Sequence, residues 1–422
     1  RKCIPGSGTG CVPANATRCR GASTCPPTEK RGSRLRVSSR CYRLWPELHT
    51  GAVMLRPDVD IAILGGGCAG LSVAVRLAAA GRSLRVVEPR ETYVEDRAWS
   101  FWRTSRDPFE DCVRRSWQSW DVHGPGGVVR RGSHRLRYQT VGAGVFYERA
   151  QSLIGHHPQA ALSLGMTARD ATQTADGWRI ETDAGCFSAR HVIDTRPPRR
   201  KPGYGQFFLG REIRTERPVF NPDIVQLMQF RPARSTGVDF VYILPYARDL
   251  ALVEVTSFAP CAPDHDVFDT WLREEIAALD PGHHEVLREE RGALPMEVGF
   301  HDPAPDGRIR MGLAGGAARP STGYAFTRIQ RQADLVTRAL VQGAPVPASL
   351  DGPFARFMDR VFLQVIQTMP ERGSALFESL FRNASRDRLE HFLSGSVHPV
   401  DRLSVMTSLP TLPFLRAAMF PA

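Results

Sequence analysis

The sequence contains no apolar run that approaches 18 residues, and no segment near its start has the apolar centre of a secretory signal. A helix needs about 20 predominantly apolar residues to cross the hydrocarbon layer of a membrane. We therefore expect no membrane-spanning helix and no export signal. Hydrophobic residues still make up 42% of the 422 residues, which is enough for a globular protein with more than one core.

Metal-binding patterns are also missing. No C-x-x-C pair occurs, and the five cysteines within residues 1–53 lie at spacings of 8, 8, 6 and 16 residues. The histidine pairs at 156–157 and 283–284 lack partners at helical spacing. Because zinc sites use closely spaced Cys and His ligands, we predict no metal. The other cysteines are scattered singly, which suits a reducing cytoplasmic compartment; they are Cys68, Cys112, Cys186 and Cys261.

Excess positive charge is concentrated at the N-terminus. The chain carries +11 at pH 7, but residues 1–53 hold ten Lys or Arg and two acids, so +8 lies there and about +3 remains. The rest of the chain has nearly equal numbers of positive and negative charges, which does not favour nucleic acid as a partner. Residues 1–53 are rich in Gly, Pro, Ser, Thr and Arg, and the first methionine is Met54. We expect residues 1–53 to be disordered, or to be non-native sequence upstream of the protein.

The strongest local pattern is DVDIAILGGGCAGLSVAVRLAAAGRSLRVVEPR at 58–90. An apolar strand at 59–64 meets three glycines in G-x-G-x-x-G order, a helix follows, and a second strand ends at Glu88. The glycines allow a tight turn, backbone approach to a pyrophosphate, and close packing of helix on strand. Glu88 is placed to accept from ribose hydroxyls, which favours FAD or NAD over NADP. The predicted cofactor-binding glycines are Gly65, Gly67 and Gly70.

Two later segments favour FAD, because FAD-binding chains often return twice to the nucleotide. The strand within 189–199 ends in Asp194 before a Pro-rich turn, and a glycine-rich turn within 308–326 precedes a helix. The start of that helix could offer N–H groups to a flavin. Taken alone, a segment of either kind is more often a plain loop than a ligand site. The candidate glycines of the late turn are Gly315, Gly316 and Gly323.

One carboxylate stands alone in an apolar strand, ALVEVTSF at 251–258. Burying a charge without a partner is unfavourable, and a buried carboxylate tends to take up a proton instead. Two interpretations follow. Glu254 either points to solvent from an edge strand or is kept neutral as a proton donor.

From about residue 60 to its end, the chain resembles the bacterial lycopene cyclases, FAD-dependent proteins of carotenoid synthesis related in fold to flavoprotein hydroxylases. In this family the key Glu is usually followed by a second acid, where this chain has Val255. We expect an acid introduced at 255 to raise the pKa of Glu254. The resemblance rests on the fingerprint glycines and on WSF at 99, VIDTRP at 192, VDFVYILPY at 238, LVEVTSF at 252, ERGALPM at 290, GLAGGAARPSTGYAF at 312, MPERGSALFESLFR at 369 and DRLSVMTSLPTLPFLRAAMF at 401.

The resemblance implies lycopene β-cyclase activity, an isomerase reaction of the intramolecular lyase type. A proton adds to C2 of the terminal alkene, the 5,6-alkene attacks the C1 cation, and C6 loses a proton to leave a β-ring. Glu254 is then the catalytic acid, reduced FAD the active cofactor, and NAD(P)H only a possible reductant. The expected substrates are lycopene and other acyclic or monocyclic carotenoids, giving γ-carotene and β-carotene. Candidate aromatic residues of the substrate cavity are Trp99, Phe101, Tyr324 and Phe326.

The C-terminal part contains apolar residues at helical spacing with interspersed arginines, at 354–369, 375–382, 388–395 and 413–420. Amphipathic helices often just cover a core. Because the implied substrate is a hydrocarbon, we predict a membrane-facing helical cap that is peripheral on the inner face of the cell membrane.

These patterns together predict an α/β flavoprotein in which a Rossmann-like FAD-binding part is interleaved with a β-sheet substrate part. A flavin-dependent hydroxylase or prenyl-chain reductase, and a non-catalytic carotenoid or lipid carrier, remain as alternatives. The predicted boundaries are 54–105, 145–200 and 295–345 for the FAD-binding part, 106–144 and 201–294 for the substrate sheet, and 346–422 for the cap.

Overall fold

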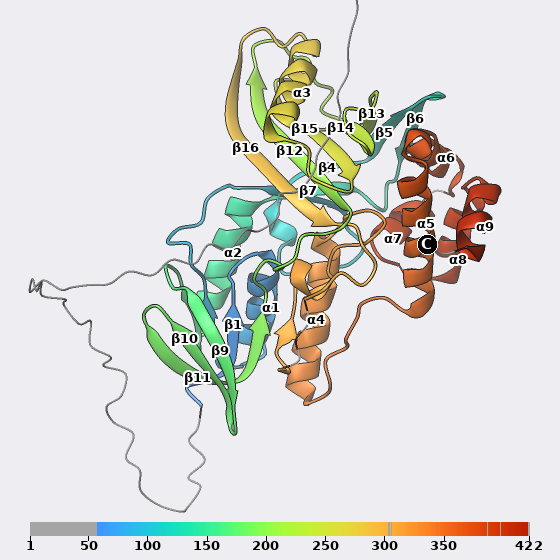
Figure 1. The fold of residues 1–422 in the computed structure, drawn as a ribbon. Coiled ribbons are helices and arrows are strands. Elements are labelled where there is room, and N and C mark those ends of the chain that lie inside the picture. The colour runs from blue at the N-terminus through green and yellow to red at the C-terminus, as the bar shows by residue number, and fades with distance from the viewer. Residues whose placement is uncertain (1–56, 303, 305, 386, 397, 421–422) are drawn as a thin grey trace, which may run out of the picture. The chain divides into compact units, whose positions relative to one another are not determined.

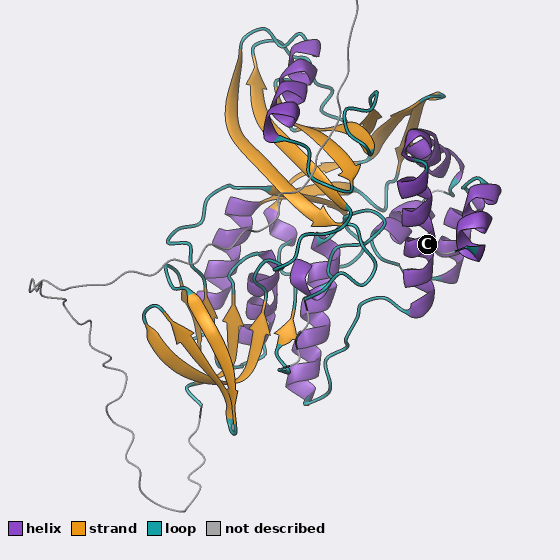
Figure 2. Cartoon of the chain, in the orientation of Figure 1, coloured by secondary structure: helices purple, strands orange, loops and turns teal. Residues whose placement is uncertain are grey.

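A seven-stranded sheet carries the N-terminal glycine motif in this computed structural model, which describes residues 57–302, 304, 306–385, 387–396 and 398–420 (Figure 1, Figure 2). Strands β8, β2, β1 and β11 run parallel, β17 also joins β11 in parallel, and β10 and β9 extend the sheet antiparallel. The strands are β1 Val59–Leu64, β2 Leu84–Val87, β8 Ala160–Ser163, β9 Ala168–Thr174, β10 Gly177–Thr182, β11 Gly185–Asp194 and β17 Ile309–Arg310.

Both faces of the central strand β1 are buried, which explains its unbroken apolar sequence. Ile61 and Ile63 pack against three helices on one face of the sheet. Ala62 and Leu64 pack on the other face, against the strands β9, β10 and β11. The three helices are α1 Cys68–Ala79, α2 Ala143–Gly155 and α4 Phe326–Gln342.

A second seven-stranded sheet has the order β16-β12-β15-β14-β13-β5-β6, and it is antiparallel except for the pair β13 and β5. Helix α3, His265–Ala278, packs on one of its faces (Figure 1). The strands are β5 Ser119–Gly124, β6 Gly127–Gly132, β12 Gly205–Thr215, β13 Ile224–Phe230, β14 Val238–Pro245, β15 Leu250–Ala259 and β16 His284–Pro295.

Strand β15 separates two environments. Val253 and Val255 pack with Trp271 of α3 on one face of the sheet. Leu252 and Glu254 alternate with them and therefore point to the opposite face. Because of this alternation, Leu252 and Glu254 line a cavity on this face of the sheet, whereas Val253 and Val255 do not.

Five helices follow α4 and gather beside the β5–β6 edge of the second sheet, where α6 packs against both strands (Figure 1). Among the residues that the structure describes, no helix combines the length and the apolar content that crossing a membrane requires. The remaining elements are α5 Pro353–Thr368, α6 Gly373–Asn383, α7 Arg388–Leu393, α8 Pro399–Thr407 and α9 Thr411–Met419, with a small sheet of β3 Ala98–Trp102, β4 Val113–Trp117 and β7 Tyr138–Gly142 and single turns of 3-10 helix at Glu110–Cys112, Leu313–Gly315 and Pro370–Arg372.

The predicted class of fold is confirmed by this arrangement of helices and mixed sheets with a helical C-terminal region. The two large sheets are interleaved along the chain, because β12 to β16 lie in sequence between β11 and β17 of the parallel sheet. The expectation about residues 1–53 lies outside the described part of the chain.

Candidate functional site

A cavity of about 760 Å³ lies where the carboxyl ends of the parallel strands meet one face of the second sheet. This is the edge at which open α/β sheets bind their ligands. Eight residues predicted from the sequence line the cavity, although they come from five separate segments of the chain: Gly65, Gly67, Glu88, Trp99, Glu254, Gly323, Tyr324 and Phe326.

The glycine turn opens onto one end of this cavity. Gly67 caps α1, and a Cβ atom added to it would meet no other atom within 4 Å. The N–H groups in the first turn of α1 have no partners within the helix, so they form a site for an anion. Gly70 has a different role: a Cβ there would lie 1.9 Å from the Gly65 carbonyl oxygen, so the helix requires glycine at this position and Gly70 itself does not line the cavity.

Glu88 holds the turn in place from the end of β2. Its carboxylate accepts hydrogen bonds from the Gly66 N–H at 2.6 Å and from the Arg90 Nε at 2.7 Å. Burial would raise the pKa of Glu88, but the hydrogen bonds from Arg90 and Gly66 outweigh it and hold the pKa below its usual value. A carboxylate has about four acceptor positions, so Glu88 keeps capacity for a ligand hydroxyl.

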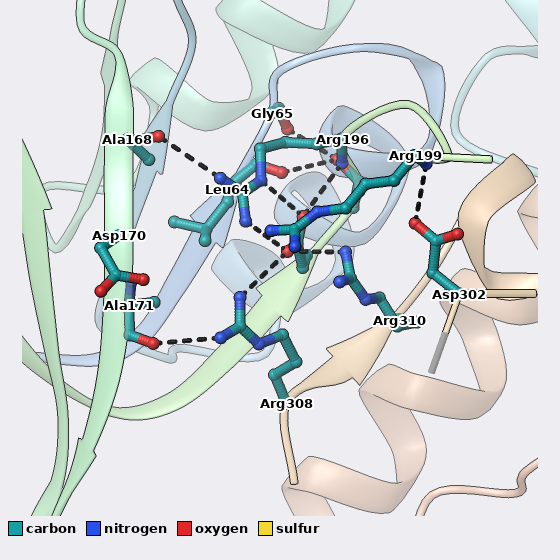
Figure 3. Close-up of polar contacts among 12 residues, drawn as sticks. Leu64, Gly65, Ala168, Asp170, Ala171, Arg196, Arg199, Asp302, Arg308 and Arg310 are labelled. Atoms are coloured by element: carbon teal, nitrogen blue, oxygen red, sulfur yellow. Dashed lines mark hydrogen bonds and ion pairs between the residues drawn. The ribbon is translucent and has the colours of Figure 1, made fainter. Parts of the chain in front are cut away.

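Asp194 is engaged by arginines instead of facing the cavity. Figure 3 shows Arg196, Arg308 and Arg310 converging at this point, and the Asp194 carboxylate pairs with them at 2.6, 3.4 and 2.8 Å, respectively. Burial alone would raise the pKa of Asp194, but Arg196 and Arg310 hold it below its usual value. The carboxylate is fully buried, and the next residues of the turn, including Arg196, line the cavity in its place.

Three other predicted residues lie away from the cavity wall. Phe101 is buried in the core of the parallel-sheet region, stacked on Phe326 with ring centroids 4.4 Å apart. Gly315 lines a separate small cavity of about 40 Å³, and Gly316 lines neither cavity. The short strand around Phe101 and the glycine run around Gly315 and Gly316 do not show in the sequence which of their residues reach the cavity. Neighbouring residues in both segments, Ser100 and Gly312, do line it.

Glu254 lies on the cavity wall and has few polar partners. Its carboxyl group accepts one hydrogen bond, from the Thr256 hydroxyl at 2.9 Å. Burial, followed by the negative charge of Glu290, raises the pKa of Glu254 to about 8, against the opposing effects of Thr256 and Arg288. The group is therefore mostly protonated at neutral pH, which a general acid requires.

The structure adds site residues that the sequence motifs did not single out. Glu290 and Tyr242 line the cavity beside Glu254, and Tyr138 shares a 2.8 Å hydrogen bond with Tyr242. Burial raises the pKa of both tyrosines, which keeps them neutral. The sequence contained a signal for Glu290 in the run Arg288-Glu289-Glu290. Alternation in a strand places the first and third residues of this run, Arg288 and Glu290, on one face.

The expectation for an acid at position 255 is wrong. Val255 is fully buried among apolar side chains beneath α3, on the face of the sheet opposite to Glu254. A carboxylate there would be separated from the cavity by the sheet and would have no partner. The second carboxylate near Glu254 is instead that of Glu290, from β16.

No cluster of three or more His, Cys, Asp or Glu side chains suited to a metal ion occurs among the described residues.

Glu254→Gln should stabilise the protein increasingly as the pH rises. The unfolded carboxyl group releases its proton near 4.5 and the folded one near 8, so the folded state holds the extra proton in this window and loses stability as the pH increases. Urea unfolding at pH 5 and pH 8 should show a gain on the order of 2 to 4 kcal/mol at pH 8 and little at pH 5. Glu289→Gln, in β16 and on the other face of the sheet, is the control, and an equal gain of Glu254→Gln at both pH values would contradict this account.

Comparison with known proteins identifies relatives over about two thirds or more of this chain. The lycopene beta-cyclase of Pseudescherichia vulneris is 25% identical over 84% of this chain and 95% of its own length. The chloroplastic lycopene beta cyclase of an Oncidium hybrid cultivar is 28% identical over 68% of this chain, which spans about 65% of the length of that relative. Among solved structures, a flavoprotein/dehydrogenase from Cytophaga hutchinsonii shares the fold with a TM-score of 0.58 and 13% identity, over 86% of this chain and 98% of that chain.

The profile of the family described as "Lycopene cyclase protein" matches residues 60–419. This match covers nearly all of the described chain and includes every motif on which the resemblance was based, except Phe420 at the end of the last one. The resemblance is therefore confirmed, and the chain belongs to the lycopene cyclase family.

Proposed function

We propose that this protein is a lycopene β-cyclase, an isomerase that closes the ends of lycopene to β-rings without net oxidation or reduction. The observation that supports it most directly is a glutamic acid kept protonated on the wall of a large cavity. An alkene is a very weak base, so its protonation needs an acid that still carries its proton near neutral pH. Apolar surroundings supply that condition for Glu254.

The proposed reaction moves one proton in and one proton out. The Glu254 O–H bond breaks as the proton joins C2 of the terminal alkene, and the C5–C6 π electrons then form the C1–C6 bond. The ring cation loses the C6 proton, and the Glu254 carboxylate is the base available to accept it. The product is an isomer of the substrate, and the acid returns to its starting state.

Aromatic side chains on the cavity wall would face the proposed substrate cation. Trp99, Tyr324 and Phe326 line the cavity from the parallel-sheet region, and Phe240 and Tyr242 line it from the second sheet. A cation over an aromatic face gains about 0.5 to 2 kcal/mol. These rings exclude water, which would otherwise trap the cation as an alcohol.

The residues at the other end of the cavity fit FAD. The first turn of α1 and Gly67 would hold the pyrophosphate, Glu88 a ribose, and the turns at 195–197, 312–313 and 323–324 the rest of the cofactor. When bound in its reduced form, the flavin supplies negative charge, worth about 4 kcal/mol for a unit pair at 4 Å and an effective dielectric of 20. NAD(P)H would serve only as the reductant that brings the cofactor to this form.

A membrane surface is the proposed source of the carotenoid. Helices α6 and α7 line the cavity with Phe377, Leu380, Phe381 and Leu393. On the outer side of the same cap, Arg360 and Arg416 are exposed among apolar side chains, as expected for a surface that enters an anionic leaflet. We place this face on the cytoplasmic leaflet of the cell membrane. The exposed apolar residues are Phe354, Phe357, Val400, Leu403, Met406, Leu412, Leu415, Met419 and Phe420.

Gly67→Val should abolish retention of FAD while leaving the fold intact. The valine side chain meets open space, so it enters the cavity where the pyrophosphate would approach and not the protein core. Purified protein should lack flavin absorbance and keep the unfolding midpoint of the apoprotein. A yellow variant with full FAD content would overturn the assignment of the glycine turn.

The double variant Leu412→Asp with Leu415→Asp should lose at least about tenfold in binding to liposomes, because each leucine buries apolar area in the leaflet. The measurement is co-sedimentation with anionic vesicles. The pair Val145→Asp and Val267→Asp, on exposed faces of α2 and α3, is the control and should bind as wild type does. Equal losses in both pairs would count against a docking face on the cap.

Glu254→Gln should reduce turnover by about 10² to 10⁴, the loss typical when an acid–base group is removed, while FAD still binds. The assay uses dithionite-reduced enzyme with lycopene in liposomes, and it follows the formation of γ-carotene and β-carotene. Wild-type protein should consume no NAD(P)H beyond priming of the flavin. Consumption in proportion to product would identify a hydroxylase or reductase, and wild-type protein that leaves lycopene unchanged would indicate a carrier.

A further inference from the structure

Four adjacent strands place one residue each in a single row across the second sheet. Tyr242 of β14 lies opposite Glu254 of β15, Glu254 lies opposite Gly210 of β12, and Gly210 lies opposite Glu290 of β16. Directly opposite residues of antiparallel strands point to the same face. All three side chains of the row line the cavity.

Gly210 leaves a gap in the middle of this row. A Cβ atom there would lie 3.2 Å from both the Cβ of Glu254 and the Cδ1 of Leu252, which is closer than ordinary contact, and 3.4 Å from the Cγ of Glu254. Because Gly210 has no side chain, the residue of β12 between the two glutamates adds none to the row. The sheet therefore brings two buried carboxyl groups, 36 residues apart in sequence, into one row on the same face.

The two carboxyl groups have unequal surroundings. Glu290 accepts a hydrogen bond from the Ala98 N–H at 2.8 Å and pairs with the Arg288 guanidinium. Among the described residues, Glu254 accepts a hydrogen bond from the neutral Thr256 hydroxyl alone. The polar contacts thus stabilise a negative charge on Glu290 more than on Glu254, although burial still raises the pKa of Glu290 above its usual value.

Arg288 is shared between two other carboxylates, and its Nη2 is buried without a hydrogen-bond partner among the described residues. Its Nε also lies 3.0 Å from Glu212, which in turn makes a two-point ion pair with Arg114 at 2.6 and 2.8 Å. Two arginines and two glutamates balance in this chain of contacts. Glu254 remains outside it, next to the negative end.

We propose that Glu290 is a positioning residue that keeps the proton on Glu254 through its charge across the Gly210 gap. This inference rests on the proposed function and adds a second residue to the acid. When Glu254 gives its proton to C2 of the alkene, the pair holds two negative charges beside one substrate cation. That arrangement attracts the cation and favours return of the C6 proton to the Glu254 carboxylate, so no other proton carrier is needed.

The negative charge of Glu290 has the sign that this role requires, because it raises the pKa of Glu254 in addition to the larger effect of burial. The charged or titratable groups that face Glu254 are Glu290 and Arg288 of β16, Tyr242 of β14 and Tyr138 of β7. The tyrosines stay neutral across the working range, so Glu290 and Arg288 are the charges that a variant can alter.

Glu290→Gln should move the alkaline limb of the activity profile to lower pH by about one unit or more, because the like charge is lost and Arg288 stays. Glu289→Gln is the matched control: it is the adjacent residue, on the opposite face, paired with Arg211 at 2.9 Å, and its profile should match wild type.

Gly210→Ala is a second variant, which retains both charges but forces Glu254 away from the gap. It should shift the limb in the same direction, and it remains informative if Glu290→Gln does not fold.

A second readout needs no turnover. The side-chain carboxyl carbons of glutamate are labelled with ¹³C, and NMR spectra are recorded on the oxidised, FAD-bound protein without lycopene. The signal that is absent from Glu254→Gln belongs to Glu254, and its change with pH gives the titration of this group. Its midpoint should fall in Glu290→Gln and Gly210→Ala and stay in Glu289→Gln. An unchanged midpoint in the folded variants would overturn the pairing. A moved midpoint in a protein that never cyclises lycopene would support the pairing and refute the proposed function.

Discussion

The proposed chemistry depends on one carboxyl group that, in the described part of the chain, accepts no hydrogen bond from a cation. Glu254 is buried on the cavity face of a sheet whose other face is covered by α3, and Arg288 pairs with Glu212 and Glu290 instead. Ionisation of Glu254 would place an uncompensated charge in apolar surroundings. Burial and the negative charge of Glu290 keep this group protonated, against the opposing effects of Arg288 and Thr256.

Much of the site could be predicted from the sequence where the signal is local. The glycines at 65, 67 and 70 and Glu88 fall within one βαβ unit, so their spacing alone fixes their neighbours. Glu254 was identifiable because it is the sole charge in an apolar strand. In both cases a stretch of fewer than about 35 residues contains the whole pattern, and the family resemblance only assigned it a chemistry.

The parts that could not be predicted depend on register and on side-chain direction. Glu290 meets Glu254 only because both strands pair with Gly210, and no local pattern shows which strands are neighbours. Phe101 and Phe326 were equivalent candidates in sequence, yet their stacking leaves only Phe326 on the cavity. For Val255 the alternation rule alone would have sufficed, because adjacent residues of a strand face opposite sides.

The cluster around Asp194 has a consequence for the range of conditions in which the fold persists. Its pKa lies below the usual value, so its contribution to stability is complete above the unfolded pKa of about 3.8 and disappears as the pH falls further, when three guanidinium groups lose their shared anion. Glu254 acts in the opposite sense at higher pH. Asp194 thus contributes less stability as the pH falls and Glu254 less as the pH rises, so the two buried carboxyl groups limit the pH range of the fold from opposite sides.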